Sequence, residues 1–299
     1  MEWVSEFRDA SNCNALPLLD LRPADAFSAW HVVNATHFDG VDGPDGLLSR
    51  LNELPPPSKK ERIGVLASSP EQACQAAAGL EARGHQCPVS LEESLLRTLP
   101  SATGRKSRAL WSPAPVLVEE LPRVLASIGD VRTALDVGSG SGRDSAYLAA
   151  AGFRVTAVDR DRALLAMAER FGNREAKEGG SVCTVVRTLG AHLSEDREWL
   201  RKNRSKLLLV VRFLRRGVLE LLHEAVAEGG FAIYEHFLKG CEKFGGPKKD
   251  SQMLTPGELR NVFSEQRGFQ VLRESEETIS DGRPVTRFVA YRARRTSKT

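Results

Sequence analysis

The 299-residue sequence lacks any apolar run that approaches the roughly 20 residues needed to span a bilayer. Residues 1–7 contain no basic region followed by an apolar core, so we expect no secretory signal. The five cysteines are scattered and form no C-x-x-C pair, which argues against a disulfide framework and against a metal cluster. These absences predict a reduced, cytoplasmic setting, with no metal site and no membrane partner.

The sequence also lacks a cluster in which aromatic and basic residues alternate, the pattern that stacks and neutralises single-stranded nucleic acid. The net charge of +3 hides an asymmetry, because residues 1–100 carry 8 basic and 14 acidic side chains, or −6, and the rest carries +9. The basic residues are spread over several expected helices, where solvated faces are the default interpretation. We expect no nucleic-acid partner, whereas the acidic N-terminal part leaves a protein partner open.

One motif dominates a chain that is long enough for two domains, namely ALDVGSGSGRD at residues 134–144. Residues 134–137 predict a buried strand, three glycines follow at alternate positions, and residues 147–151 predict a helix that ends at Gly152. In such a strand–turn–helix unit, backbone N–H groups and the helix N-terminus face a ligand. Glycine allows the ligand to approach the backbone closely.

The spacing of the glycines distinguishes two kinds of nucleotide site. A dinucleotide fingerprint that begins at Gly138 would need a third glycine where the sequence has Arg143. The spacing is instead G-x-G-x-G, with Asp136 two residues ahead, and the next expected strand, residues 153–158, is followed by Asp159. An acid at that position can bind the two hydroxyls of a ribose. A βαβ turn without a ligand is the alternative, and the register of glycines and acids argues against it.

This pattern resembles motif I of class I S-adenosylmethionine-dependent methyltransferases. In that family the acid ahead of the glycines lies near the positively charged amino-acid end of the cofactor. The turn after the third strand commonly holds adenine through an acid or amide, but residues 187–193 contain no acid, so we expect backbone contacts there. The resemblance implies S-adenosyl-L-methionine as cofactor, bound by Asp136, Gly138, Ser139, Gly140, Gly142, Asp159, Arg160, Leu189, Gly190, Arg212 and Phe213.

Later segments resemble the tellurite-resistance and thiopurine-type branch of the same class. They are RFL at 212–214, GGFAIYEHF at 229–237, the glycine-rich loop that follows, and TPGEL at 255–259. The resemblance covers residues 111–292 and implies a small-molecule acceptor, such as a thiol or another chalcogen nucleophile. Alternating strands and helices followed by a hairpin predict an α/β, Rossmann-like fold, with a mostly parallel seven-stranded sheet and an antiparallel edge hairpin.

Three residues near the ends of two expected central strands are the candidates for catalysis. Arg212 lies at the end of strand 206–214, and Glu235 and His236 end strand 231–237. Arg212 could hold an anionic acceptor, and His236 could act as a base or orient an anion. An ion pair for Arg212 and simple packing for His236 are the structural alternatives. A thiolate or chalcogenide acceptor would need no base.

The first hundred residues contain a separate α/β pattern. LLDLR at 18–22, an aromatic residue at Phe27 and WHVVNA at 30–35 resemble the opening of a rhodanese domain. The polar, basic and glycine-containing segment that follows is typical of a linker. The predicted organisation is a rhodanese-like domain over residues 1–100, a linker over 101–110 and a methyltransferase domain over 111–299.

A rhodanese carries sulfur on a thiolate in the loop between a strand and a helix. Alignment of the strand over residues 62–68 places Ala67 at the nucleophile position. Cys74 lies within the following helix, residues 71–83, where a small buried residue is expected. We therefore expect a rhodanese-like domain without sulfur transfer, with a structural or partner-binding role. A rhodanese-type sulfurtransferase and a non-catalytic cofactor-binding scaffold are the alternatives for the whole chain.

Overall fold

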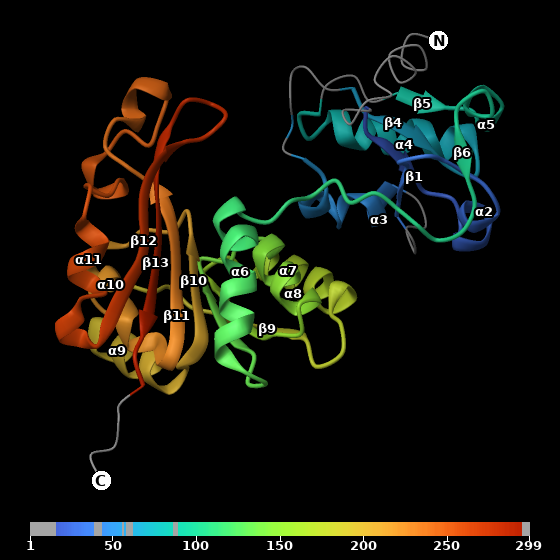
Figure 1. Ribbon diagram of the computed structural model, residues 1–299. Coiled ribbons are helices and arrows are strands. Elements are labelled where there is room, and N and C mark those ends of the chain that lie inside the picture. Colours follow the sequence, from blue (N-terminus) through green and yellow to red (C-terminus); the bar gives the residue numbers. More distant parts are fainter. Residues whose placement is uncertain (1–15, 39–43, 56, 58–61, 86–88, 295–299) are drawn as a thin grey trace. The chain divides into compact units, whose positions relative to one another are not determined.

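The computed structural model describes residues 16–38, 44–55, 57, 62–85 and 89–294 (Figure 1). The chain divides into two compact units, Met1–Ser112 and Pro113–Thr299. Both units are built from parallel strands and helices, which confirms the predicted α/β class. In the described part of the chain, no helix combines the length and the apolar character that crossing a membrane would require.

The first unit contains a four-stranded parallel sheet in the order β3-β1-β4-β5, and β2 and β6 form a separate antiparallel pair. Side chains alternate between the two faces, so Leu18 and Leu66 join one apolar cluster and Leu19 and Val65 join the other. The elements are β1 (Leu18–Asp20), α2 (Ala24–Ala29), β2 (His31–Val32), β3 (Thr36–His37), α3 (Pro44–Leu48), η1 (Leu51–Glu53), β4 (Gly64–Leu66), α4 (Pro70–Glu81), β5 (Val89–Leu91), α5 (Glu93–Leu96) and β6 (Ser101–Ala102).

Residues 101–110, expected to be a linker, are hydrogen-bonded to the first unit. They begin with β6, which pairs with β2. The Oγ of Ser107 accepts a 2.7 Å hydrogen bond from the backbone N–H of His37, and Leu110 packs against an apolar cluster of this unit. The polar composition predicts a linker, and in the structure this backbone is hydrogen-bonded and packed as part of the first unit.

The second unit is built on a seven-stranded sheet in the order β12-β13-β11-β10-β7-β8-β9. Strands β11, β10, β7, β8 and β9 pair in parallel, and β13 is inserted antiparallel between β11 and β12, as the sequence predicts. Helices α6, α7 and α8 cover one face, and α9, α10 and α11 cover the other (Figure 1). The elements are α6 (Pro115–Ile128), β7 (Thr133–Val137), α7 (Arg143–Ala150), β8 (Arg154–Asp159), α8 (Arg162–Glu175), β9 (Ser181–Val186), α9 (Leu193–Lys202), β10 (Ser205–Val211), α10 (Arg216–Leu219), η2 (Leu222–Ala225), β11 (Val226–Phe237), η3 (Cys241–Phe244), η4 (Asp250–Gln252), α11 (Glu258–Val262), η5 (Glu265–Arg267), β12 (Phe269–Thr278) and β13 (Pro284–Arg292).

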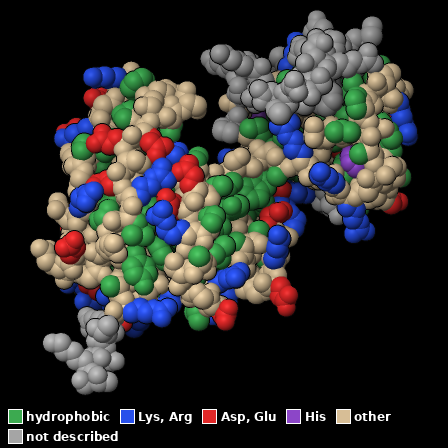
Figure 2. All heavy atoms as spheres, in the orientation of Figure 1, with side chains coloured by type: hydrophobic (Ala, Val, Ile, Leu, Met, Phe, Trp, Pro, Cys, Tyr) green, Lys and Arg blue, Asp and Glu red, His purple; other side chains and the backbone are tan. Residues whose placement is uncertain are grey.

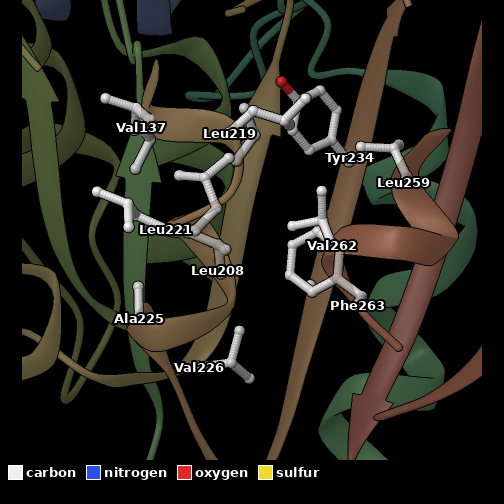
Figure 3. Packing of buried hydrophobic residues seen from close by; sticks show 14 of the residues in the cluster. Val137, Leu208, Leu219, Leu221, Ala225, Val226, Tyr234, Leu259, Val262 and Phe263 are labelled. Atoms are coloured by element: carbon white, nitrogen blue, oxygen red, sulfur yellow. The ribbon is translucent and has the colours of Figure 1, made fainter. Parts of the chain in front are cut away.

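The central strand β10 is apolar along its length because helices cover both of its faces. Leu208 joins the apolar cluster on the side of α9 to α11, and Leu209 joins the cluster on the side of α6 to α8. Figure 3 shows the first of these clusters, in which Leu208 lies across from Val262 and Phe263. Packing on both faces fixes the strand ends that carry the candidate site.

The sequence of residues 216–227, rich in Leu and Glu, predicts one helix, but this segment has shorter, irregular helices in the structure. It forms the single turn α10 and the 3-10 helix η2, and β11 then begins. Val218, Leu222 and Ala225 are all buried in the same cluster, so packing rather than the helical period sets this path. Glu228 with the two glycines after it predicts a turn, but these residues lie within β11.

Thr255 followed by Pro256 predicts a capping threonine with proline as the first helical residue, but the structure has no helix starting at residue 256. Helix α11 begins at Glu258, and the Glu258 carboxylate accepts hydrogen bonds from the backbone N–H and the hydroxyl of Thr255, at 2.9 and 3.0 Å. The glutamate therefore satisfies the threonine donors, the reverse of the expected direction for the hydroxyl.

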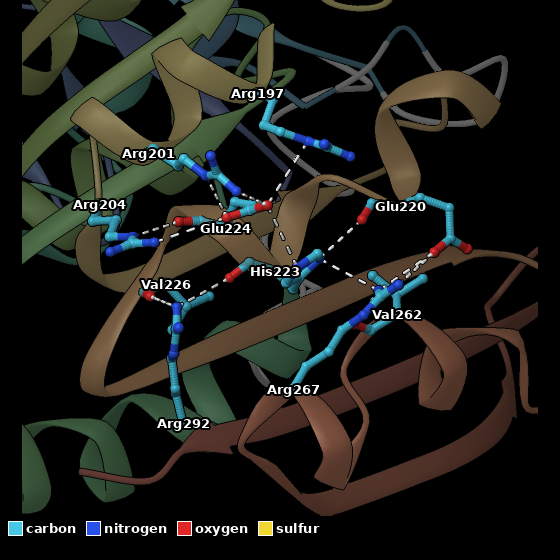
Figure 4. Close-up of polar contacts among 10 residues, drawn as sticks. All are labelled: Arg197, Arg201, Arg204, Glu220, His223, Glu224, Val226, Val262, Arg267 and Arg292. Atoms are coloured by element: carbon cyan, nitrogen blue, oxygen red, sulfur yellow. Dashed lines mark hydrogen bonds and ion pairs between the residues drawn. The ribbon is translucent and has the colours of Figure 1, made fainter. Parts of the chain in front are cut away.

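At the amino ends of the parallel strands, arginines converge on Glu224 (Figure 4). Arg201 donates hydrogen bonds of 2.8 and 3.0 Å to its carboxylate, and Arg204 donates to its backbone carbonyl at 2.9 Å. The hydrogen bond from Arg201 is the main reason that the pKa of Glu224 is lowered. These contacts attach α9 to the turn before β11, at the edge opposite the glycines.

Candidate active site

A cavity of about 660 Å³ lies at the carboxyl ends of β7, β8, β9 and β10. Ligands of open α/β sheets bind at this edge, in the crevice outside the strand ends. Five segments of the second unit line it: Gly138, residues 158–160, residues 187–189, residues 212–216, and Lys249 with Ser251 and Gln252.

The three motif glycines have different reasons to be glycine. All have positive φ, at 75° for Gly138, 53° for Gly140 and 84° for Gly142. A Cβ on Gly138 would lie 2.5 Å from the Cβ of Phe213, and one on Gly142 would lie 2.4 Å from the Cβ of Ala168. A Cβ on Gly140 would meet no protein atom within 4 Å. Two glycines therefore permit close packing, and the middle one leaves open space beside the loop.

Asp159 lies on the cavity wall, at the end of β8. Its carboxylate accepts hydrogen bonds from the backbone N–H groups of Gly140 at 3.1 Å and Asp161 at 3.0 Å. The N–H groups of Gly138 and Ser139 both donate to the carbonyl of Val158, and the buried hydroxyl of Ser139 has no partner. The loop is thus fastened to β8, with a carboxylate held where a ribose could bind.

Two further carboxyls lie behind the loop and do not line the cavity. Asp136 is 2% exposed, and Ser145 donates a 2.6 Å hydrogen bond to it. Burial, and then the charge of Asp144, raise the pKa of Asp136 to about 7. Burial, and then the charge of Glu235, raise the pKa of Asp144 to about 6, although the Ala114 N–H donates to it at 2.6 Å. A cation bound nearby would favour the charged form of both.

Arg212 and Glu235 form an ion pair, whose Nη2–Oε1 distance is 2.8 Å. Arg212 lines the cavity, but Glu235 is 2% exposed and does not. The second oxygen of Glu235 accepts a 2.8 Å hydrogen bond from Nε of Arg287. With both oxygens bound to guanidinium groups, Glu235 orients Arg212 and is unsuited to accept a substrate proton.

His236 is buried and does not line the cavity. Its Nε2 lies 3.0 Å from the carbonyl oxygen of Gln252, so this nitrogen carries the proton and donates it. Burial lowers the pKa of His236 to about 4, which keeps the ring neutral near pH 7. The structure thus connects His236 to the cavity only through Gln252, which lines the wall.

On the expected adenine side, Leu189 lines the cavity and Gly190 does not. The N–H of Gly190 donates a 2.7 Å hydrogen bond to Asp196, which also pairs with Arg187 at 2.8 Å. Phe213 and Arg160 both lie on the wall. The structure therefore brings Gly138, Asp159, Arg160, Leu189, Arg212 and Phe213 together around one cavity.

The cavity wall is strongly basic, with Asp159 as its one carboxylate among the residues described. Among those residues, Arg160, Arg215 and Lys249 have no acidic partner, whereas Arg216 pairs with Glu258. Sequence reasoning named only Arg160 and Arg212 and missed the rest. The sequence could have indicated these basic residues, because several of them directly follow the carboxyl ends of β9 and β10. The six basic residues are Arg160, Arg187, Arg212, Arg215, Arg216 and Lys249.

A protein-family model matches a segment of each unit. Residues 123–262 match the family model of the tellurite resistance protein TehB, and residues 3–96 match that of the rhodanese-like domain. A search of curated proteins finds none that matches significantly.

Solved structures similar to this chain include TehB from Haemophilus influenzae, at 17% identity over 61% of this chain and a TM-score of 0.46. The match covers 64% of that chain, slightly less than two thirds of its length. Magnesium protoporphyrin IX methyltransferase from Synechocystis, with bound S-adenosylhomocysteine, is 16% identical over 59% of this chain and 81% of its own, with a TM-score of 0.43. The N-methyltransferase NodS from Bradyrhizobium japonicum is 14% identical over 61% and 90%, with a TM-score of 0.43.

The match of residues 123–262 to the TehB family model agrees with the branch of methyltransferases that the sequence resembles. In this chain the segment that matches the TehB family model follows a segment that matches the rhodanese-like domain. The cavity fits the cofactor, because Asp159 is presented on its wall and the position beside Gly140 is open.

Proposed function

We propose that this protein transfers a methyl group from S-adenosylmethionine to a small anionic acceptor, with a thiolate or chalcogen oxyanion as the favoured nucleophile. The observation that carries the proposal is the composition of the cavity wall, where among the described residues Asp159 is the one carboxylate and Arg160, Arg215 and Lys249 have no acidic partner. Asp159 would bind the ribose of the cofactor, so the basic side chains remain available to bind an anionic acceptor. The family name, tellurite resistance, supports a chalcogen acceptor.

The two ends of the cavity would have separate roles. Asp159 and Leu189 would hold the adenosine, while Asp136 and Asp144 would favour the positively charged amino-acid end by their burial behind the glycines. When bound, S-adenosylmethionine supplies an electrophilic methyl carbon, and its sulfonium sulfur leaves with the electrons of the broken bond. The residues of the cavity need only align the acceptor with that carbon and exclude water.

Proton abstraction has little support from the geometry. Glu235 is bound to two arginines, and His236 is buried away from the cavity with its Nε2 proton donated to Gln252. An acceptor that is already ionised, such as a thiolate, attacks without a base. Basic residues on the wall would favour that ionised form.

The test begins with calorimetric titration of the full chain with S-adenosylmethionine. Release of S-adenosylhomocysteine is then measured with selenite, tellurite, anionic thiols, neutral thiols of equal size, and tRNA. We expect cofactor binding and turnover with anionic chalcogen compounds. Binding without turnover on any acceptor would favour the scaffold alternative, and turnover on tRNA alone would refute the small-acceptor proposal.

A further inference from the structure

The register of the sheet aligns three charged residues on neighbouring strands. Val211, the last residue of β10, pairs with Glu235 of β11, and Glu235 pairs with Arg287 of β13. Arg212 follows directly after β10, and its backbone N–H donates a 2.9 Å hydrogen bond to the carbonyl of Glu235. Arg212, Glu235 and Arg287 therefore form a row across the edge of the sheet that carries the cavity.

Glu235 is the centre of this row and depends on both neighbours. Its oxygens are divided between Nη2 of Arg212 and Nε of Arg287, each at 2.8 Å. At 2% exposure, its carboxylate has little access to water. Removal of one partner from a buried ion pair leaves an uncompensated charge, which the structure tolerates poorly.

Arg287 is in turn held by two acids. Its Nη1 lies 2.6 Å from Glu277 of β12 and 3.1 Å from Glu119 of α6. Arg273 of β12 also binds both of these glutamates, each at 2.6 Å. Figure 2 shows acidic and basic side chains side by side over β12 and β13, next to α6. Arg287 thus has a fixed position, while Arg273 supports the same network without touching Glu235.

Arg212, at the other end of the row, has an unused donor. Its φ of 57° is in the left-handed region, and its guanidinium carbon lies 4.3 Å from the ring centroid of Phe237. Its Nη1 is buried and has no hydrogen-bond partner, although the side chain lines the cavity. A buried N–H without an acceptor is costly, so a ligand that supplies an oxygen would be favoured there.

We propose that Arg287 is a positioning residue for the methyl acceptor: it holds Glu235, which holds Arg212 so that Nη1 can donate to an anionic oxygen of the acceptor. The inference rests on the proposed function and adds to it a residue 52 positions away from Glu235 that touches neither ligand. Without Arg287, Glu235 would have Arg212 as its one remaining partner. The guanidinium would then turn toward the carboxylate and lose its orientation toward the cavity.

The experiment uses the full chain and two thiols of equal size, 3-mercaptopropionate and 3-mercapto-1-propanol, which differ in one carboxylate. Cofactor affinity is measured first, by calorimetry. Kinetic constants for both thiols are then compared among the wild type, Arg287→Met, Arg287→Lys and the control Arg273→Met. If a thiol is not turned over, its binding to the complex with S-adenosylhomocysteine is measured instead.

We expect the wild type to prefer the anionic thiol at least tenfold in KM or Kd. Arg287→Met should abolish this preference with cofactor affinity changed less than threefold, Arg287→Lys should restore part of it, and Arg273→Met should retain it while also lowering the melting temperature. Absence of cofactor binding would refute the proposed function itself. Cofactor binding without an anionic preference in the wild type would refute the role of Arg212. An anionic preference that Arg287→Met retains, or that Arg273→Met loses equally, would refute the positioning role alone.

Discussion

The hydroxyl of Ser145 donates a 2.6 Å hydrogen bond to the carboxylate of Asp136, and both side chains are buried behind the glycine loop. One hydrogen bond to a charged group offsets only part of the cost of burying it. Burial, with the nearby charge of Asp144, therefore raises the pKa of Asp136 to about 7. The second unit carries an acid that is protonated in the folded, ligand-free protein over much of the acidic range.

This raised pKa predicts that the contribution of Asp136 to the free energy of unfolding falls as pH rises. The folded state retains a proton on Asp136 that the unfolded state releases near pH 4, so its contribution is complete below pH 4 and is lost through pH 7. We expect this contribution to the free energy of unfolding to fall by roughly 1 kcal/mol per pH unit between pH 5 and 7. His236, whose pKa is lowered to about 4, contributes in the opposite direction up to its ordinary pKa of 6.5. The free energy of unfolding is measured at each pH by urea unfolding. The transition is followed by the fluorescence of Trp199, with the other tryptophans replaced by phenylalanine.

Asp136→Asn isolates this contribution, because it keeps the shape of the side chain and removes its titration. As pH rises from 5 to 7, we expect the free energy of unfolding of the wild type to fall relative to that of Asp136→Asn, while Asp161→Asn, at the exposed start of α8, should keep the wild-type slope. Equal slopes in the wild type and Asp136→Asn would contradict the assignment.

Asp159→Ala is expected to weaken cofactor binding. The carboxylate lines the cavity and would accept hydrogen bonds from the ribose hydroxyls, so its loss should cost on the order of 1.5–3 kcal/mol. The same change frees the N–H groups of Gly140 and Asp161, which loosens the loop. Calorimetric titration of the full chain with S-adenosylmethionine measures the change.

Asp161→Ala is the matched control, two residues along the chain. Its carboxylate caps α8 by accepting from the N–H groups of Ala163 and Leu164, and it does not line the cavity. We expect a loss of about 1 kcal/mol in stability with unchanged affinity. Equal affinity in the wild type and Asp159→Ala would place the ribose elsewhere.

Substitutions of Gly142 and Gly140 should affect folding stability and cofactor affinity differently. Gly142→Ala would force a Cβ to within 2.4 Å of Ala168, so we expect a loss of roughly 3 kcal/mol or more from overpacking and left-handed strain together. Gly140→Ala meets no protein atom and should cost only about 1–2 kcal/mol of backbone strain. Its affinity for the cofactor should nevertheless fall at least tenfold, because the methyl group occupies the open space. Unfolding curves and cofactor titration of both variants test this separation.

Much of the fold could be predicted because strong local signals coincide with tertiary structure. The apolar run of β10 and the glycines after β7 indicated a doubly covered parallel sheet with its ligand edge. The path of residues 216–227 could not be predicted, since the apolar side chains from Val218 to Val226 are all buried in one cluster. Cys74 shows the reverse error: expected to be buried, it is exposed, because Ala73, Ala76 and Ala77 form the packed face of α4.

Part of the candidate site could be predicted from the sequence for a similar reason. Asp159 follows a strand directly, so its place at the cavity could be read from position alone. Arg215 and Lys249 reach the same cavity through turns whose path depends on the left-handed residue Arg212 and on the loop after β11. Arg287 is one of two arginines on β13, which lies between β12 and β11, and only the register of β11 with β13 pairs it with Glu235.

The loop after β4 lacks the chemistry of a sulfur carrier. Ala67 follows the strand, and Ser69 caps α4 by accepting a 3.3 Å hydrogen bond from the N–H of Gln72. Pro70 opens the helix and removes one backbone donor from the position where an anion would need it. Cys74 is the fifth residue of α4, about 6 Å along the axis from its start, and its Sγ contacts Ser90.

We therefore predict no sulfurtransferase turnover by this protein, and no loss of methyl transfer in Cys74→Ser. The thiol is exposed, so it can react with alkylating reagents, but neither a helix N-terminus nor an arginine of the loop is placed to stabilise a persulfide on it. Thiosulfate and cyanide are added to the full chain, and thiocyanate release is measured together with mass spectrometry of the Cys74 peptide. A persulfide on Cys74 that cyanide discharges, and that Cys74→Ser abolishes, would show that the rhodanese-like domain transfers sulfur after all.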